Sequence, residues 1–214
     1  MTIISLKREN FRADGAVRVE FSDDSSLLLS THYLPDVVIS DKDGALPLLA
    51  CRDLSPREEE AFRFAALCYQ AEKAALGLIA RAEQSALALT AKLQRRRFAG
   101  AVVRAVVSRL LDQDLLNDGR YAEFWVRSRL AARKAQTPQQ LLAALGKKGI
   151  DRKSSLNALE QAIDPETEYA LLLRYLEKTR IIRSEGKFFL RTQLKHEGFS
   201  PAVLERYFDE APAE

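Results

Sequence analysis

The chain has 214 residues, of which 47% are hydrophobic and 29% are charged, so it is long enough to bury a core of its own. It contains no run of eighteen apolar residues, and charge enters by Lys7, which speaks against a membrane span and a secretory signal and leads us to expect a cytoplasmic protein. Cys51 and Cys68 form no C-x-x-C pair and have no histidine at ligand spacing, which speaks against a zinc site or a disulfide framework.

The charge is distributed unevenly along the chain. The whole chain carries a net charge of +3, but residues 57–163 hold 19 basic and 11 acidic residues, a net of +8. Residues 1–56 have a net charge of −3, and residues 164–214 one of −2. A basic centre between acidic ends is a weak indication of a polyanionic partner, because it creates a local attractive field that the total charge hides.

The first 34 residues are typical of β structure. Residues 16–21 (AVRVEF) alternate apolar and polar side chains, residues 26–34 (SLLLSTHYL) are a β-tolerant run, and the SDD between them suits a turn. This pattern predicts a hairpin, with ISLKREN (residues 4–10) as a candidate third strand. Regular structure is then interrupted by Pro35, Asp41, Asp43, Gly44 and Pro47.

Signals for helix N-termini recur from Ser55 onward. Ser55, Pro56 and Glu58 have the spacing of a capping box, with proline at the first helical position. Thr137 and Pro138 repeat this arrangement before another predicted helix. Further predicted N-caps are Asn117 or Asp118, Asp151, Asp164 and Ser200.

A leucine pattern recurs about every fifty residues. The triplet L-x-x-x-L-x-x-x-x-[FI] occurs at residues 89–98, 141–150 and 190–199, with offsets of 52 and 49 between the last members. A longer helix is predicted before each triplet and an amphipathic helix after it. The pattern therefore predicts a three-helix unit used three times, and units of this size bury their faces against neighbouring units.

One position in each triplet is expected to end a helix. This position comes immediately before the last member of the triplet. It is occupied by Gly149 in KKGID and by Gly198 in HEGFS, where glycine suits a left-handed C-cap, and by Arg97 in RRRFA. Arg95 and Arg96 precede it at a helix C-terminus, where cations interact favourably with the helix dipole.

The helix that begins near Arg120 shows two apolar faces on a wheel at ~100° per residue. One face contains Tyr121, Phe124, Trp125 and Ala132, and the other Ala122, Val126 and Leu130. We expect such a helix to pack on both sides, with its aromatic side chains in the core rather than on a stacking platform. Two basic stripes are expected between the faces, one of Arg120, Arg127 and Lys134 and one of Arg129 and Arg133.

Catalytic motifs are sparse. His32 and His196 have no nearby Ser, Cys or Asp in a nucleophile arrangement, and the acidic run at residues 58–60 is explained by its place at a helix N-terminus. No glycine loop for phosphates is present. We therefore expect no catalytic residue, no metal and no cofactor. Residues 81–134 hold 12 basic and 5 acidic residues, and arginine suits phosphate or carboxylate.

The chain resembles the RecX family, the regulators of the RecA recombinase. LGLIARAEQSALALTAKLQRRRF is similar to the first repeat of that family, LNDGRYAEFWVRSR with KKGID to the second, and ALLLRYLEKTR with LRTQLKHEGFSPAVLERYF to the third. ISLKREN and VRVEFSDDSSLLLS resemble the N-terminal extension of longer members. The resemblance implies a mainly α fold, with three tandem three-helix repeats in a curved array and a small N-terminal β-hairpin region. The expected divisions are residues 1–54, 55–111, 112–163 and 164–214.

The resemblance also implies a function. We expect a non-enzymatic modulator of RecA, with inhibition favoured over activation. It is expected to bind the groove of the RecA filament on single-stranded DNA and to alter filament assembly, ATPase activity and strand exchange. The expected partners are the RecA filament and, weakly, single-stranded DNA, with no membrane, and the protein is expected to be a monomer. The alternatives are a stand-alone helical DNA-binding module and a structural repeat protein with solvated arginines. The candidate contact residues are Arg95, Arg96, Arg120, Arg127, Arg129, Arg133, Lys134, Lys147 and Lys148.

Overall fold

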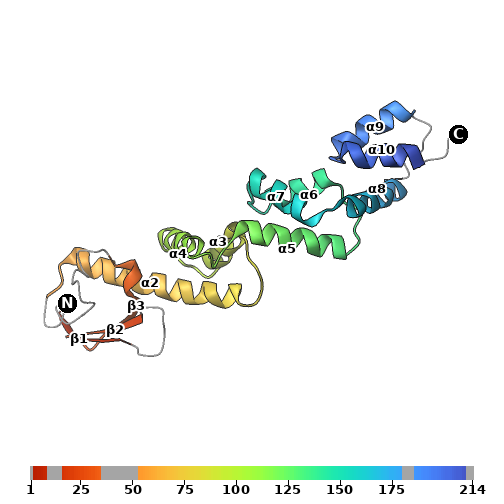
Figure 1. The fold of residues 1–214 in the computed structure, drawn as a ribbon. Helices are drawn as coiled ribbons and strands as arrows, with labels where there is room; N and C mark the ends of the chain where they lie inside the picture. The colour runs from red at the N-terminus through yellow and green to blue at the C-terminus, as the bar shows by residue number, and fades with distance from the viewer. Residues whose placement is uncertain (1, 9–15, 35–52, 180–185, 211–214) are drawn as a thin grey trace. The chain divides into compact units, whose positions relative to one another are not determined.

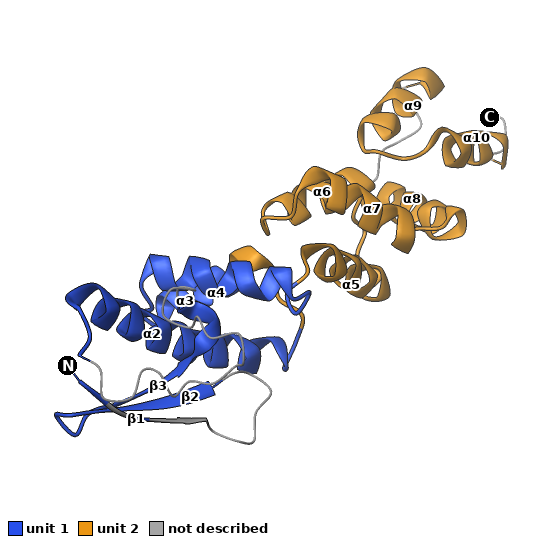
Figure 2. Ribbon diagram, turned by 60° about the vertical axis from the view of Figure 1, so that its left-hand side comes forward, with its two compact units in different colours: residues 1–82, 89–116 blue, residues 83–88, 117–214 orange. Residues whose placement is uncertain are grey.

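The protein is mainly α-helical with a small antiparallel sheet near its N-terminus, which confirms the predicted fold class (Figure 1). The structure, a computed structural model, describes residues 2–8, 16–34, 53–179 and 186–210. Cys51 and the predicted interruptions from Pro35 to Pro47 lie outside the described residues. Contacts divide the chain into two compact units, residues 1–82 with 89–116 and residues 83–88 with 117–214 (Figure 2).

The N-terminal sheet has three antiparallel strands in the order β1-β2-β3. The strands are β1 (Ile3–Arg8), β2 (Ala16–Phe21) and β3 (Ser26–Ser30). Val19 and Phe21 are buried, as the alternation along β2 requires. In the turn that follows, the carboxylate of Asp23 accepts a hydrogen bond from the backbone N–H of Ser25 at 3.1 Å. The predicted hairpin and its candidate third strand are both confirmed.

Among its described residues, the first unit also contains η1 (Thr31–Tyr33), α2 (Pro56–Ile79), α4 (Gly100–Asp112) and most of α3 (Ala86–Arg95). The start of α3, residues 86–88, belongs to the second unit. The core of the sheet packs on α2, where Phe62 and Ala65 are buried. The predicted capping box starts this helix: the Ser55 hydroxyl accepts from the N–H of Glu58 at 3.4 Å, and the N–H of Ser55 donates to the Glu58 carboxylate at 2.8 Å.

A half-buried polar cluster links the end of the sheet to α2 and α4. The Nε of Arg109 lies 3.4 Å from a carboxylate oxygen of Glu72, and the guanidinium carbon of Arg109 lies 5.8 Å from the centroid of the Tyr33 ring. Burial, followed by the neighbouring Glu72, raises the pKa of the Tyr33 phenol above its ordinary range. The tyrosine is therefore a neutral packing group, and the cluster ties three elements of the first unit together.

The second unit contains six helices among the described residues. They are α5 (Asp118–Ala131), α6 (Pro138–Gly146), α7 (Arg152–Ala162), α8 (Pro165–Thr179), α9 (Lys187–His196) and α10 (Pro201–Glu210). Side chains cap the predicted N-termini, and Asn117 rather than Asp118 caps α5. The other capping side chains are Thr137, Asp151, Asp164 and Ser200.

The leucine triplets lie in the core, as predicted. Leucines at both leucine positions of each triplet are fully or almost fully buried, and so are Ile150 and Phe199, while Phe98 is half-buried. The position before each last member is left-handed, with φ of +66° at Arg97, +83° at Gly149 and +87° at Gly198. The expected left-handed C-cap is confirmed at both glycines, and Arg97 adopts the same conformation although it is not a glycine.

Two matching contacts connect segments of the second unit that are far apart in the chain. The Ser85 hydroxyl accepts from the N–H of Ala88 at 3.2 Å and donates to the carbonyl of Lys148 at 3.1 Å. The buried Thr137 hydroxyl accepts from the N–H of Gln140 at 3.2 Å and donates to the carboxylate of Glu197 at 2.7 Å. We call these contacts the Ser85 junction and the Thr137 junction. In the Ser85 junction, a hydroxyl just before α3 hydrogen-bonds to the turn that follows α6. In the Thr137 junction, a hydroxyl just before α6 hydrogen-bonds to the turn that follows α9.

Glycine allows both turns to approach closely. A Cβ on Gly149 would lie 2.7 Å from the Cβ of Leu87, and a Cβ on Gly198 would lie 3.2 Å from the backbone nitrogen of Gln139. That same nitrogen donates to the carbonyl of Glu197 at 3.0 Å. Each junction therefore needs a residue without a side chain, for both its left-handed φ and its close contact.

Candidate partner-binding surface

Two cations lie against the single tryptophan of the chain. The guanidinium carbon of Arg129 is 4.8 Å from the centroid of the Trp125 ring, and Nζ of Lys148 is 5.5 Å from it. Nζ of Lys148 is also 6.0 Å from the centroid of Tyr121. Both distances to the indole are within the range of cation–π attraction. We call these four residues the Trp125 cluster.

Local sequence explains how the Trp125 cluster forms. Tyr121, Trp125 and Arg129 are four residues apart on α5, so they share one face of the helix. Lys148 comes from the turn after α6, immediately before the left-handed Gly149. Its backbone carbonyl is held by the Ser85 junction, which fixes the point from which the side chain reaches the indole.

The second apolar face of α5 is not packed as predicted. Ala122 and Val126 are fully buried, but Tyr121 and Trp125 are half-buried and Phe124 is 60% exposed. The prediction that the helix packs on both sides is therefore wrong for Phe124. The close contact between α5 and α7 is made by the small side chains of the other face, which let the two helices approach.

Both predicted basic stripes end earlier than expected. The helix α5 stops at Ala131, and Arg133 adopts a left-handed φ of +48° beyond it. Arg133 and Lys134 are exposed, but they do not continue the helical spacing of Arg127 and Arg129. The prediction of stripes running to Arg133 and Lys134 is wrong, because the helical wheel assumed a helix that the chain does not form there.

The remaining predicted contact residues are exposed or paired locally. Nε of Arg120 lies 2.7 Å from a carboxylate oxygen of Glu83. Nη2 of Arg127 lies 2.5 Å from a carboxylate oxygen of Glu123, one turn earlier on α5. Such surface pairs contribute between about 0 and 1 kcal/mol to stability, so they leave the arginines able to exchange partners. Lys147 is exposed at the C-cap of α6. Arg95 and Arg96 are exposed at the end of α3, in the first unit.

Sequence reasoning thus named the cations of the Trp125 cluster but not its aromatic part. Of the predicted residues, the structure brings Arg129 and Lys148 together at one ring. The i, i+4 spacing of Tyr121, Trp125 and Arg129 was visible in the sequence and could have indicated a ring beside a cation. The contribution of Lys148 could not be found that way, because it comes from a different helix.

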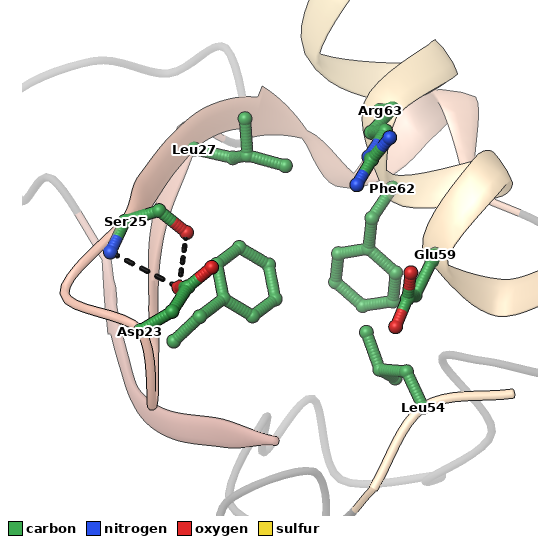
Figure 3. Close-up of a pocket in the computed structure, with 8 residues that line it drawn as sticks. Asp23, Ser25, Leu27, Leu54, Glu59, Phe62 and Arg63 are labelled. Carbon is green, nitrogen blue, oxygen red and sulfur yellow. Dashed lines mark hydrogen bonds between the residues drawn. The ribbon is translucent and has the colours of Figure 1, made fainter. Parts of the chain in front are cut away.

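A small hollow in the first unit offers an alternative site. It has a volume of about 260 Å³ and lies between the β2–β3 hairpin and α2, with Phe21, Leu27, Leu54 and Phe62 as its apolar walls (Figure 3). Asp23, which lines it, is engaged by Ser25, and these hydrogen bonds lower the pKa of its carboxyl. The contact between Ser25 and Asp23 belongs to the turn between β2 and β3, and no histidine, cysteine or lysine is among the described residues that line the hollow.

Cys68, the cysteine that the structure describes, is buried. Burial raises the pKa of the Cys68 thiol to about 11, so the thiol is protonated and poorly reactive near neutral pH. Within the described ranges, no three His, Cys, Asp or Glu side chains are grouped to hold a metal ion. No helix in those ranges is both long and apolar enough to cross a membrane.

Several known proteins similar to this chain carry the name regulatory protein RecX. Regulatory protein RecX from the Nichols strain of Treponema pallidum is 37% identical over 153 residues, which are 71% of this chain and 92% of that protein, and the same protein from a second strain of that species matches equally well. Regulatory protein RecX from Thermobifida fusca is 32% identical over 112 residues, 52% of this chain and 59% of that protein. No family model matches the chain.

Solved structures agree on the fold. A crystal structure of regulatory protein RecX superposes with a TM-score of 0.68 at 20% identity, covering 98% of this chain and 99% of that one. The structure of RecX from Lactobacillus salivarius has a TM-score of 0.52 at 22% identity, covering 67% of this chain and 96% of that one. Together with the sequence identity over nearly the whole length of the Treponema protein, these matches show that the chain belongs to the RecX family of regulatory proteins.

Proposed function

We propose that this protein regulates RecA by binding the RecA filament on single-stranded DNA, without chemistry of its own. Membership of the RecX family supports the regulatory role, and the Trp125 cluster is the observation that carries the contact surface. The net charge of +8 over residues 57–163 supports a partner that presents phosphates or carboxylates. Binding alters filament assembly, ATPase and strand exchange, with inhibition as the expected direction.

The Trp125 cluster suits such a partner for two physical reasons. The guanidinium of Arg129 and the ammonium of Lys148 each attract an anion, and the ring beside them holds both side chains near one place. A surface whose cations are already ordered loses less conformational entropy on binding than one of freely rotating side chains. The flanking predicted contacts, Arg120, Arg127 and Lys147, add attraction at longer range.

Titration of the protein into a RecA ATPase assay on single-stranded DNA tests this proposal. Reversal of both charges in Arg129→Glu/Lys148→Glu should raise the concentration needed for half-maximal effect by at least about tenfold, which corresponds to about 1.4 kcal/mol. The exposed Arg152 and Lys153 on α7 provide the matched control, because Arg152→Glu/Lys153→Glu also reverses two charges but lies outside the Trp125 cluster and should have little effect. Equal effects of the two changes would refute the assignment of the surface.

Salt dependence and retention on RecA separate this proposal from the alternatives. Contacts made by many cations should weaken steeply as salt is raised, so an effect on the ATPase that does not change with salt would contradict the electrostatic contribution. A stand-alone DNA-binding module would be retained by DNA alone and would not require RecA. A purely structural repeat protein would bind neither RecA nor DNA.

A further inference from the structure

The most exposed large apolar side chain among the described residues is Phe188, in the first turn of α9. It is 85% exposed, and its neighbour Phe189 is 55% exposed. The helix is anchored from its other side, where Leu190 and Leu194 are buried in the core that α9 shares with α8 and α10. Phe188 therefore contributes nothing to that core, and the stability of the fold does not explain a phenylalanine at this position.

The same helix concentrates positive charge in an otherwise acidic part of the chain. α9 carries Lys187, Arg191 and Lys195 and no acidic side chain, whereas the rest of residues 164–214 has five more acidic than basic residues. The spacing i, i+4, i+8 places the three cations in one row along the helix. Lys195 is exposed, and the one ion pair that Arg191 forms with the described residues is a contact of 3.4 Å with the exposed Glu205.

A helical wheel places Phe188 next to this row of cations. At ~100° per residue, Phe188 and Lys195 are ~20° apart and point away from Leu190 and Leu194. Thr192 lies on the same outer side, and its hydroxyl donates to the carbonyl of Phe188 at 3.0 Å. The outer face of α9 therefore combines an accessible ring with cations one and two turns away.

We propose that the outer face of α9, formed by Phe188, Arg191 and Lys195, binds single-stranded nucleic acid. The ring of Phe188 stacks on an unpaired base, and the two cations, which both follow Phe188 along the helix, contact successive backbone phosphates on one side of that base. Single strands fit this face better than a duplex, because the bases of a duplex are already stacked and offer no free face to a side ring. An acidic protein surface would use the cations but not an 85% exposed ring.

This inference rests on the proposed function only because that function brings the protein close to single-stranded DNA. Its test does not require RecA. The full-length protein is titrated into a fluorescein-labelled 20-residue oligothymidylate and binding is followed by anisotropy. Phe188→Ala should weaken binding by about fivefold to a hundredfold, the range expected for loss of one stacked base. Phe188→Trp should retain binding. Leu173→Ala on α8 is the matched control, because Leu173 is 45% exposed and lies outside the face.

Two further measurements distinguish stacking from charge. Lys195→Glu should reduce the slope of log affinity against log salt by about one, as expected for loss of one phosphate contact. Inorganic polyphosphate has the charge of a nucleic acid but no bases, so Phe188→Ala should leave its affinity unchanged. Equal loss of affinity for both polymers, tighter binding to a 20-base-pair duplex, or no difference between Phe188→Ala and Leu173→Ala would overturn the proposal. Failure of the RecA assay with Arg129→Glu/Lys148→Glu would leave this result intact.

Discussion

Replacing Gly149 with alanine tests whether the junctions hold the second unit together. At φ +83° a residue with a Cβ is strained by about 1–2 kcal/mol. The new Cβ would also lie 2.7 Å from the Cβ of Leu87, and relieving such overpacking costs about 1–3 kcal/mol. We therefore expect Gly149→Ala to lower the free energy of unfolding by about 2–5 kcal/mol, a large share of the 5–15 kcal/mol typical of a folded protein.

Urea denaturation followed by circular dichroism measures this effect, with two other glycines as references. Gly146 is the last residue of α6 and would place its Cβ in open space, so Gly146→Ala should be neutral or stabilise by up to about 1 kcal/mol. The loss of stability in Gly198→Ala should lie between those of the other two variants, because the new Cβ would lie 3.2 Å from the backbone nitrogen of Gln139. If Gly149→Ala and Gly146→Ala had the same urea midpoint, the requirement for a glycine in the junction would be refuted.

Three further predictions concern single groups. Thr137→Val should cost about 2 kcal/mol by urea denaturation, because the helix cap and the hydrogen bond to Glu197 are both lost, whereas Thr137→Ser should retain most of the stability. Hydrogen bonds from Thr167 lower the pKa of Asp164 in the folded protein. The ionised carboxylate therefore contributes to the free energy of unfolding above the ordinary aspartate pKa of about 3.9, and this contribution is lost as the pH falls through the lower pKa of the folded state. Asp164→Asn should therefore reduce the loss of stability on acidification, and an unchanged profile of urea midpoint against pH would contradict this. In a Cys51→Ser background, the buried Cys68, with its pKa raised to about 11, should react with a thiol reagent only at the rate of unfolding; rapid reaction in native buffer would show that it is accessible.

The sequence predicted those features that depend on local chemistry. The capping box at Ser55 and the caps at Thr137 and Asp151 form as expected, because each requires only side chains within three residues of the helix start. The two leucines of each triplet are buried because their i, i+4 spacing places them on one face of a helix. The four-part division at residues 1–54, 55–111, 112–163 and 164–214 stays a prediction.

The features that the sequence did not predict depend on contacts between distant segments. The Ser85 hydroxyl meets the carbonyl of Lys148 across 63 residues, and nothing in the local pattern of either segment specifies the other. The end of α5 at Ala131 was missed because the apolar and basic periodicity continues beyond the helix. Phe124 was assigned to the core because periodicity shows which residues share a face, but not whether another element covers that face.

The turn at Lys148 and Gly149 links the stability of the second unit to its proposed contact surface. Its backbone is held by the Ser85 junction, while the side chain of Lys148 reaches the ring of Trp125. A displaced turn would therefore move one of the two cations of the Trp125 cluster, whereas the turn at Gly198 contributes no side chain to that cluster. Gly149→Ala should accordingly weaken the effect on the RecA ATPase more than Gly198→Ala does, even at a temperature where both variants remain folded. If equally folded samples of the two variants acted alike, the junction and the contact surface would be independent.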